Sequence, residues 1–218
     1  MKKVAIAGAT GLVGSFCLRT LLDSPEVESV LSLTRRPTKM VHPKLKELTI
    51  EFSNLNALPG DLSVAAVFCC LGTTIKKAGS QSEFQKVDLD YVTSLAVWGI
   101  KHNARHFLAV SSMGANPKSM VFYNKVKGNM EAAVSQLGYE SVDIFRPSLL
   151  LGSRSEVRIG EQVGEKVMGV FAPLMKGPLE KYRPIRAEVV ARAMVERALH
   201  SKAGVFVHDS SEVAALGA

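Results

Sequence analysis

The stretch of sequence that decides the fold is KVAIAGATGLVG, residues 3–14. Residues 3–7 form a short, largely apolar run, and residues 12–22 carry apolar side chains at helical spacing. Between these segments, Gly8, Gly11 and Gly14 stand at intervals of three. The pattern predicts a strand, a tight turn and a helix, which is how a βαβ unit begins.

The glycine spacing is typical of a loop that approaches a phosphate group. Glycine lets the backbone turn sharply and come close to a pyrophosphate, while the helix N-terminus offers free N–H groups and the positive end of its dipole. The order G-x-x-G-x-x-G differs from the more common G-x-G-x-x-G, and a merely structural turn is the alternative. Because the loop follows a strand and opens a helix, we expect a dinucleotide to bind at Gly8, Thr10, Gly11, Leu12, Val13 and Gly14.

The end of the second predicted strand, residues 27–33, indicates which dinucleotide binds. An NAD site has an acidic residue there, about 20 residues beyond the glycines, for the ribose 2′-hydroxyl. Here the strand is followed instead by Arg35 and Arg36. Paired guanidinium groups suit a 2′-phosphate through bidentate, charge-assisted hydrogen bonds. The sequence therefore favours NADP, with a solvated surface pair of arginines as the alternative.

The remainder of the chain alternates between strand and helix patterns. Further strands are predicted at residues 45–52, 64–70, 106–111 and 141–145, and helices at 81–103, 121–137 and 187–199. Several strands are apolar almost throughout, which implies burial on both faces. The alternation predicts an α/β protein with a Rossmann-type doubly wound parallel sheet in three α/β/α layers.

Residues 1–218 are predicted to form a single domain. After Leu151 the pattern loosens into a stretch rich in glycine and proline, so residues 151–218 are expected to be a small substrate-side portion that does not fold independently. Within it we expect a short strand at 205–207 and a frayed tail at 209–218.

A second group of residues points to acid–base chemistry. Tyr123 and Lys127 are four residues apart and share a face of the predicted helix. An ammonium beside a phenol favours the phenolate, which brings the pKa of a tyrosine toward the working range. Ser111 and Ser112 follow the strand at 106–111, and Ser112 is the better third member, with Ser111 assigned to backbone capping. We interpret Ser112, Tyr123 and Lys127 as a catalytic triad, although a tyrosine and a lysine alone are usually surface residues.

Together these motifs resemble those of atypical short-chain dehydrogenase/reductases, in particular the HTATIP2-like oxidoreductases. The resemblance covers most of the chain and includes CLGTT (70–74), VDLDYV (87–92), SSMGA (111–115), YNKVKG (123–128) and RPSLLL (146–151). It implies an NADP(H)-binding oxidoreductase that transfers hydride between the cofactor and a small carbonyl or alcohol substrate.

The resemblance also implies roles for single residues. Ser112 would hydrogen-bond the substrate oxygen, and Tyr123 and Lys127 would also contact the cofactor. The further cofactor contacts that it implies are Leu71 and Gly72 on the adenosine side, Leu150 beside the nicotinamide, and Arg158 at a phosphate, where a solvated side chain is the alternative. Asp88 stands where the wider superfamily often has an asparagine. A structural helix charge and a proton relay both stay open for it.

Composition excludes several other classes of function. The formal net charge is +7, but basic residues come as scattered pairs and only 6% of residues are aromatic, so no nucleic acid is expected as a partner. The three cysteines are odd in number and lie in apolar segments, which predicts a reducing compartment without disulfides. The five histidines are dispersed, so no metal site is expected.

The sequence predicts a cytoplasmic protein with no membrane partner. No run approaches the roughly 18 apolar residues of a spanning helix, and the opening Met1-Lys2-Lys3 leaves no room for a signal peptide. The expected partner is a small-molecule carbonyl substrate. The alternative function, suggested by the resemblance, is an NADPH-sensing regulatory module that binds a protein partner with little or no turnover. An epimerase or dehydratase is disfavoured by the small C-terminal portion.

Overall fold

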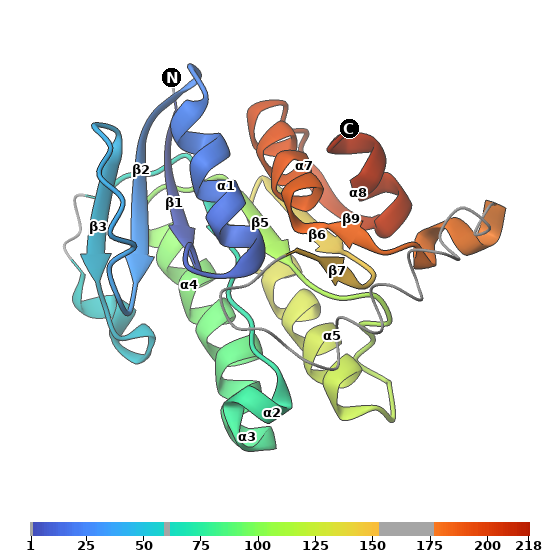
Figure 1. Ribbon diagram of the computed structural model, residues 1–218. Coiled ribbons are helices and arrows are strands. Elements are labelled where there is room, and N and C mark those ends of the chain that lie inside the picture. Colours follow the sequence, from blue (N-terminus) through green and yellow to red (C-terminus); the bar gives the residue numbers. More distant parts are fainter. Residues whose placement is uncertain (1, 59–61, 153–176) are drawn as a thin grey trace.

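A parallel sheet of seven strands forms the centre of the computed structural model, which describes residues 2–58, 62–152 and 177–218 (Figure 1). The strands are β1 (Lys2–Ala7), β2 (Val27–Thr34), β3 (Leu45–Thr49), β4 (Ala66–Cys69), β5 (His106–Val110), β6 (Ser141–Arg146) and β9 (Gly204–Asp209). Their order across the sheet is β3-β2-β1-β4-β5-β6-β9. The order reverses at β1, and a doubly wound sheet binds its ligand at such a switch point, beyond the carboxyl ends of the strands.

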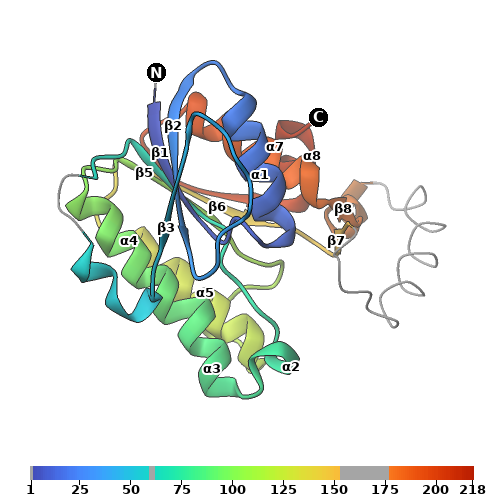
Figure 2. The ribbon, with the colours of Figure 1, turned by 60° about the vertical axis from the view of Figure 1, so that its left-hand side comes forward.

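Helices cover both faces of this sheet (Figures 1 and 2). One face carries α1 (Leu12–Asp23), α7 (Ala187–Leu199) and α8 (Ser210–Leu216), and the other carries α4 (Tyr91–Lys101) and α5 (Phe122–Ser135). Successive side chains of β1 point to opposite faces of the sheet, because side chains alternate along a strand. Val4 and Ile6 pack with α1 and α7, whereas Ala5 and Ala7 pack on the side of α4 and α5. The predicted Rossmann-type three-layer fold is confirmed.

The helix predicted at 81–103 has a different internal structure. It consists of α3 (Gln81–Gln85), a π-helical turn η2 (Lys86–Asp90) and α4, and a short helix α2 (Ile75–Ala78) precedes it. No proline or glycine marks the π-helical turn in the sequence. The hydrophobic pattern therefore predicted the length of the helix but not its change of hydrogen bonding.

The prediction of a frayed tail is wrong. The last strand, β9, extends to Asp209, and α8 follows it directly. The Asp209 carboxylate accepts hydrogen bonds from the backbone N–H groups of Ser211 and Glu212, and the Glu212 side chain accepts one from the Asp209 N–H in return. This capping box satisfies donors that are free at most helix starts, and the fully buried Val213 anchors the helix.

The remaining elements are small. β7 (Leu150–Leu151) and β8 (Ile185–Arg186) form a two-stranded parallel sheet, and the described residues also include the 3-10 helices η1 (Phe52–Ala57) and η4 (Gly177–Tyr182). The strand predicted to reach Phe52 ends at Thr49, because Phe52 begins η1 and stacks with Tyr91, with ring centroids 5.8 Å apart.

Candidate functional site

The glycine loop joins β1 to α1 at the carboxyl edge of the sheet. Gly8 has a φ of 85°, and a Cβ at this position would lie 2.4 Å from the carbonyl oxygen of Cys70. A Cβ on Gly14 would lie 2.1 Å from the carbonyl oxygen of Gly8. Both positions therefore require glycine, because the loop packs directly against the end of β4 and against the first turn of α1.

The N-terminus of α1 has the features that a phosphate needs. Gly11 is the N-cap, no side chain caps the helix, and no acidic residue lies in its first turn. Thr10 is exposed, Leu12 is half-buried and Val13 is buried, so Val13 can contribute only its backbone N–H. Because the first N–H groups of a helix have no partner within it, they are available to an anion. The residues present thus fit the pyrophosphate of a dinucleotide.

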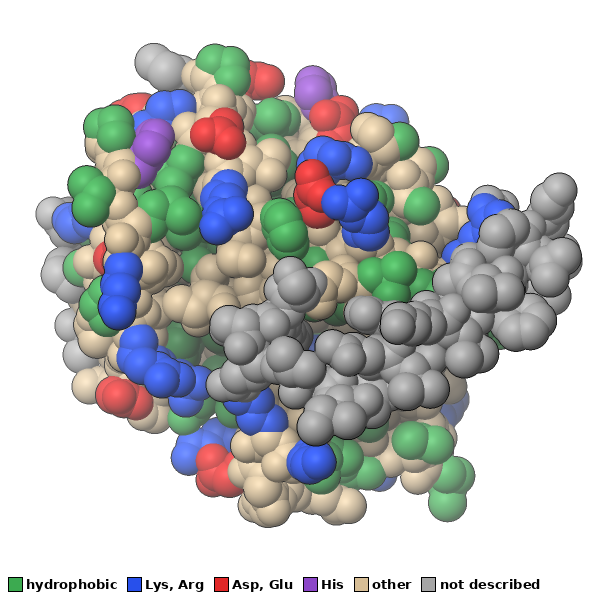
Figure 3. Space-filling view, viewed as in Figure 1, with side chains coloured by type: hydrophobic (Ala, Val, Ile, Leu, Met, Phe, Trp, Pro, Cys, Tyr) green, Lys and Arg blue, Asp and Glu red, His purple; other side chains and the backbone are tan. Residues whose placement is uncertain are grey.

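The arginines predicted to select NADP lie at the end of β2, and both are exposed. The Thr34 hydroxyl accepts the Arg36 N–H at 3.2 Å and donates to the Arg36 carbonyl at 2.6 Å, which fixes the turn. No carboxylate in the described ranges pairs with Arg35 or Arg36. Lys and Arg side chains gather on this side of the molecule, near the carboxyl ends of β2 and β3 (Figure 3).

Lys127 lies on the inner side of α5 and is buried, with an exposed fraction of 4%. Its Nζ is 2.7 Å from Oδ1 of the fully buried Asp88. The contact is an ion pair rather than a well-angled hydrogen bond, because Asp88 Oδ1 has no hydrogen-bond partner in the described part of the chain. Burial lowers the pKa of Lys127, but Asp88 and Tyr123 outweigh it and raise that pKa above its ordinary value.

Tyr123 and Ser112 are both half-buried. The Tyr123 ring lies 5.3 Å from the Phe84 ring, measured between centroids. The Ser112 hydroxyl donates to the Met113 carbonyl at 3.3 Å, a long bond that a better acceptor could replace.

The loop that carries Ser112 is tied to the helix that carries Tyr123 and Lys127. The Asn116 N–H donates to the Asn124 carbonyl at 3.0 Å. A Cβ on Gly128 would lie 2.2 Å from the Asn116 carbonyl carbon, so only glycine allows this approach of loop and helix. The fold thus brings the loop after β5 against α5.

The remaining predicted cofactor contacts flank the glycine loop. A Cβ on Gly72 would lie 3.5 Å from Asp88 Oδ1 and 3.9 Å from Lys127 Nζ, so the exit of β4 passes beside the buried ion pair. Leu71 and Leu150 are half-buried on opposite sides of the sheet. A Cβ on Gly152 would lie 2.8 Å from Leu12 Cδ1, which puts the end of β7 beside the start of α1. Arg158 lies outside the described residues.

Sequence reasoning missed a buried carboxylate below the serine loop. Glu131 Oε1 accepts hydrogen bonds from the Ser111 hydroxyl and from Arg146 Nε, the latter at 3.0 Å, and Arg146 Nη2 lies 2.5 Å from Oε2. The bond to Glu131 raises the pKa of Arg146 against the effect of burial. The assignment of Ser111 to backbone capping is therefore wrong. The sequence signals only that Glu131, four residues after Lys127, lies on the same helix face, and this spacing does not reveal its contact with Ser111.

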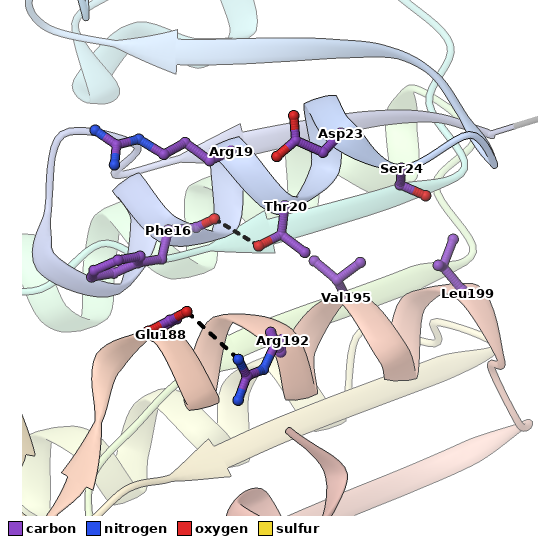
Figure 4. Close-up of a pocket in the computed structure, with 9 residues that line it drawn as sticks. All are labelled: Phe16, Arg19, Thr20, Asp23, Ser24, Glu188, Arg192, Val195 and Leu199. Atoms are coloured by element: carbon purple, nitrogen blue, oxygen red, sulfur yellow. Dashed lines mark hydrogen bonds and ion pairs between the residues drawn. The ribbon is translucent and has the colours of Figure 1, made fainter. Parts of the chain in front are cut away.

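A groove of about 550 Å³ between α1 and α7 lies apart from this site (Figure 4). Phe16, Val195 and Leu199 supply its apolar lining, and at its rim Arg192 Nη1 pairs with Glu188 Oε1 at 3.5 Å. None of the predicted site residues that the structure describes lines it. We interpret it as the gap between two packed helices, because the chemistry-bearing side chains lie at the carboxyl edge of the sheet.

A model of the NAD dependent epimerase/dehydratase family matches residues 4–212. The chain belongs to this family. Protein HTATIP2 of Rattus norvegicus is 34% identical over 172 residues, which are 77% of this chain and 71% of that protein. Protein FMP52, mitochondrial, of Candida albicans is 33% identical over 201 residues, 88% of this chain and 85% of that protein. The predicted resemblance to the HTATIP2-like group is confirmed.

Two solved structures share the fold of this chain. The human epimerase family protein SDR39U1 with NADPH has a TM-score of 0.63 and 20% identity, with 99% of this chain and 80% of that chain covered. The enzyme WbmH of Bordetella bronchiseptica in complex with NAD+ has a TM-score of 0.69 and 19% identity, with 96% and 76% covered. The chain thus shares its fold with solved structures that contain NADPH or NAD+.

The comparisons correct the predicted location. Fungal relatives from Candida albicans, Emericella nidulans and Aspergillus fumigatus are named mitochondrial, so the prediction of a cytoplasmic protein is wrong. Neither the lack of a secretory signal nor the lack of a spanning run distinguishes the cytoplasm from a mitochondrion. Within the described residues, the helices lack the combined length and apolar character required to cross a membrane.

Proposed function

We propose that this protein is an NADPH-dependent oxidoreductase that transfers hydride between NADP(H) and a small carbonyl or alcohol substrate. The observation that carries the proposal is the buried ammonium of Lys127, one helical turn from Tyr123 and beside Gly72. A buried charge is costly and perturbed groups gather at functional sites, so this arrangement favours a catalytic role over a structural one.

The glycine loop and the α1 N-terminus would hold the pyrophosphate. Arg35 and Arg36 would hold the 2′-phosphate, and we propose Leu71, Gly72, Leu150 and Arg158 as further contacts. Of the related structures, SDR39U1 is in complex with NADPH and WbmH with NAD+, so the choice of NADP depends on the arginines. The bound cofactor supplies the hydride.

In the reducing direction, Tyr123 donates its phenolic proton to the substrate oxygen as the carbonyl carbon accepts hydride. The Ser112 hydroxyl donates a hydrogen bond to the same oxygen and holds it where negative charge develops. The Lys127 ammonium stabilises the phenolate that remains on Tyr123. In the oxidising direction the phenolate takes the proton back from the alcohol.

The test is the Tyr123→Phe variant, assayed with a panel of carbonyl compounds and NADPH. We expect at least about a 100-fold loss of kcat, because a general acid contributes at least that factor. Calorimetry should still detect NADP+ binding, because the glycine loop and the arginines proposed to hold the phosphates are intact. Undiminished turnover of every responsive substrate would show that the catalytic assignment is wrong. If the wild-type protein oxidises no NADPH with any substrate but captures a protein only when NADPH is present, the sensing function replaces it.

A further inference from the structure

Two pairs of side chains, each four residues apart, meet across neighbouring helices. Phe84 and Asp88 lie on the buried side of the segment formed by α3 and η2. Phe84 packs against Tyr123, with ring centroids 5.3 Å apart, and Asp88 pairs with Lys127 at 2.7 Å. Because residues four apart share a helix face, both contacts fix one register between the helices. Each member of the proposed Tyr123/Lys127 pair therefore has its own partner.

Among the described residues, the titratable groups that act on Lys127 come from three elements. They are Asp88 from η2, Tyr123 from α5 itself and Cys69 from β4. Burial raises the pKa of the Cys69 thiol to about 12, so this group is neutral at physiological pH. Asp88 thus supplies the negative charge that faces the buried ammonium.

Glu131 lies one turn further along α5, but it is engaged elsewhere. Both of its carboxylate oxygens bind the Arg146 guanidinium, at 3.0 and 2.5 Å. Arg146 therefore compensates the charge of Glu131, and Asp88 remains the carboxylate that pairs with Lys127.

We propose that Asp88 is a positioning residue that keeps Lys127 charged and in place, an inference that rests on the proposed function. Oδ1 of Asp88 holds the ammonium, while Oδ2 accepts the Thr73 N–H at 2.8 Å. One carboxylate thereby links the lysine to the loop after β4, where Gly72 lies beside both charges. The π-helical turn at Asp88 agrees with this role, because such turns are frequent at functional sites.

The test is the pH dependence of NADPH-linked reduction in Asp88→Asn. The amide keeps an oxygen for the Thr73 N–H but removes the charge, so burial of Lys127 is no longer opposed by a carboxylate. The lysine then loses its proton at lower pH, and we expect the alkaline limit of the rate to move down by about 1 pH unit or more. The control is Asp90→Asn in the same turn, which removes an exposed carboxylate and should leave the limit in place. A rate reduced equally at every pH, with an unmoved limit, would overturn the proposal.

A second measurement does not depend on turnover. In the wild type the raised pKa of Lys127 contributes stability that is complete below the unfolded value of about 10.5 and is lost as pH rises through the folded value. In Asp88→Asn the sign is reversed, since a lysine with a lowered pKa costs stability until rising pH removes its charge. The difference in unfolding free energy between the wild type and Asp88→Asn, measured by urea unfolding, should therefore become smaller as the pH rises from about 7 to about 10.

This measurement separates the two claims. If the difference in unfolding free energy between wild type and Asp88→Asn becomes smaller with rising pH, but the wild-type protein reduces no carbonyl compound, the proposed function is rejected and the charge assignment is kept. If that difference does not change with pH, the inference is rejected. If Asp88→Asn is too unstable to assay, the free energy of unfolding of the double variant Asp88→Asn/Lys127→Met tests the inference instead. The double variant should recover stability, because it removes the uncompensated buried charge. No recovery would again reject the inference.

Discussion

Arg35 and Arg36 stand at the end of β2 with their side chains in solvent, in a turn that Thr34 fixes. We expect the double variant Arg35→Ala/Arg36→Ala to lose about 10-fold to 100-fold in NADP+ affinity, because charge-assisted bonds to a 2′-phosphate are lost. NAD+ affinity should change little, since NAD+ has a free hydroxyl at that position. Calorimetry with both nucleotides measures the two constants. Arg105→Ala is the control, an exposed arginine at the amino end of β5, and an equal loss for both nucleotides would contradict the assignment.

Single residues show how far the site could be predicted from the sequence. Tyr123 and Lys127 are visible because they are neighbours on one helix, and spacing along a chain is what a sequence displays. Asp88 was singled out by resemblance, but its pairing with Lys127 joins residues 39 positions apart and depends on helix packing. The contact of Ser111 with Glu131 was missed for the same reason. Contacts between elements are set by the fold, and no local pattern encodes them.

At the scale of elements, hydrophobic periodicity predicted most strands and helices, but it did not predict the pattern of backbone hydrogen bonds within a helix. The π-helical turn at 86–90 is a change of backbone hydrogen bonding that no proline or glycine marks, so the sequence pattern does not reveal it. The C-terminal helix α8 was missed for another reason. It is only seven residues long, too short for periodicity to show, and its signal is the capping sequence that begins at Asp209.

The capping box makes α8 testable. We expect Asp209→Ala to lower the free energy of unfolding by about 1 kcal/mol, because the N–H groups of Ser211 and Glu212 lose their acceptor. Asp209→Asn is the matched control and should keep most of the stability, since asparagine caps helices about as well as aspartate. Urea unfolding of the three proteins measures the difference. Equal stability of the alanine variant and the wild type would mean that the box does not hold this helix.

At the scale of the whole molecule, one buried carboxylate connects the elements at the β5, β6 and β9 end of the sheet. Asp143 on β6 is fully buried, and around it lie His106 Nε2 at 2.6 Å, His208 Nε2 at 2.5 Å and Arg197 Nε at 2.7 Å. These partners come from β5, β9 and α7, so one side chain connects four elements. The cluster includes none of the proposed site residues in the described part of the chain, so its effect should be on stability rather than on catalysis.

Acid titration tests this cluster. Burial raises the pKa of Asp143, but the hydrogen bonds from His106, His208 and Arg197 outweigh it and hold that pKa well below its usual range. The stability that Asp143 contributes is therefore complete above the unfolded pKa of about 4 and is lost as pH falls toward the folded value. We expect Asp143→Asn to be about 3–5 kcal/mol less stable at pH 7, because it leaves a buried guanidinium unpaired.

The difference in unfolding free energy between the wild type and Asp143→Asn should become smaller below about pH 4. There the wild type begins to lose the stability that the ionised Asp143 contributes. Urea unfolding of both proteins at pH 7 and at pH 3 gives the comparison, with the exposed Asp23→Asn as a control that should match the wild type at both values. A deficit of equal size at the two pH values would mean that the carboxylate is not held ionised by its neighbours. The loss at pH 7 would then reflect packing around β6 rather than charge.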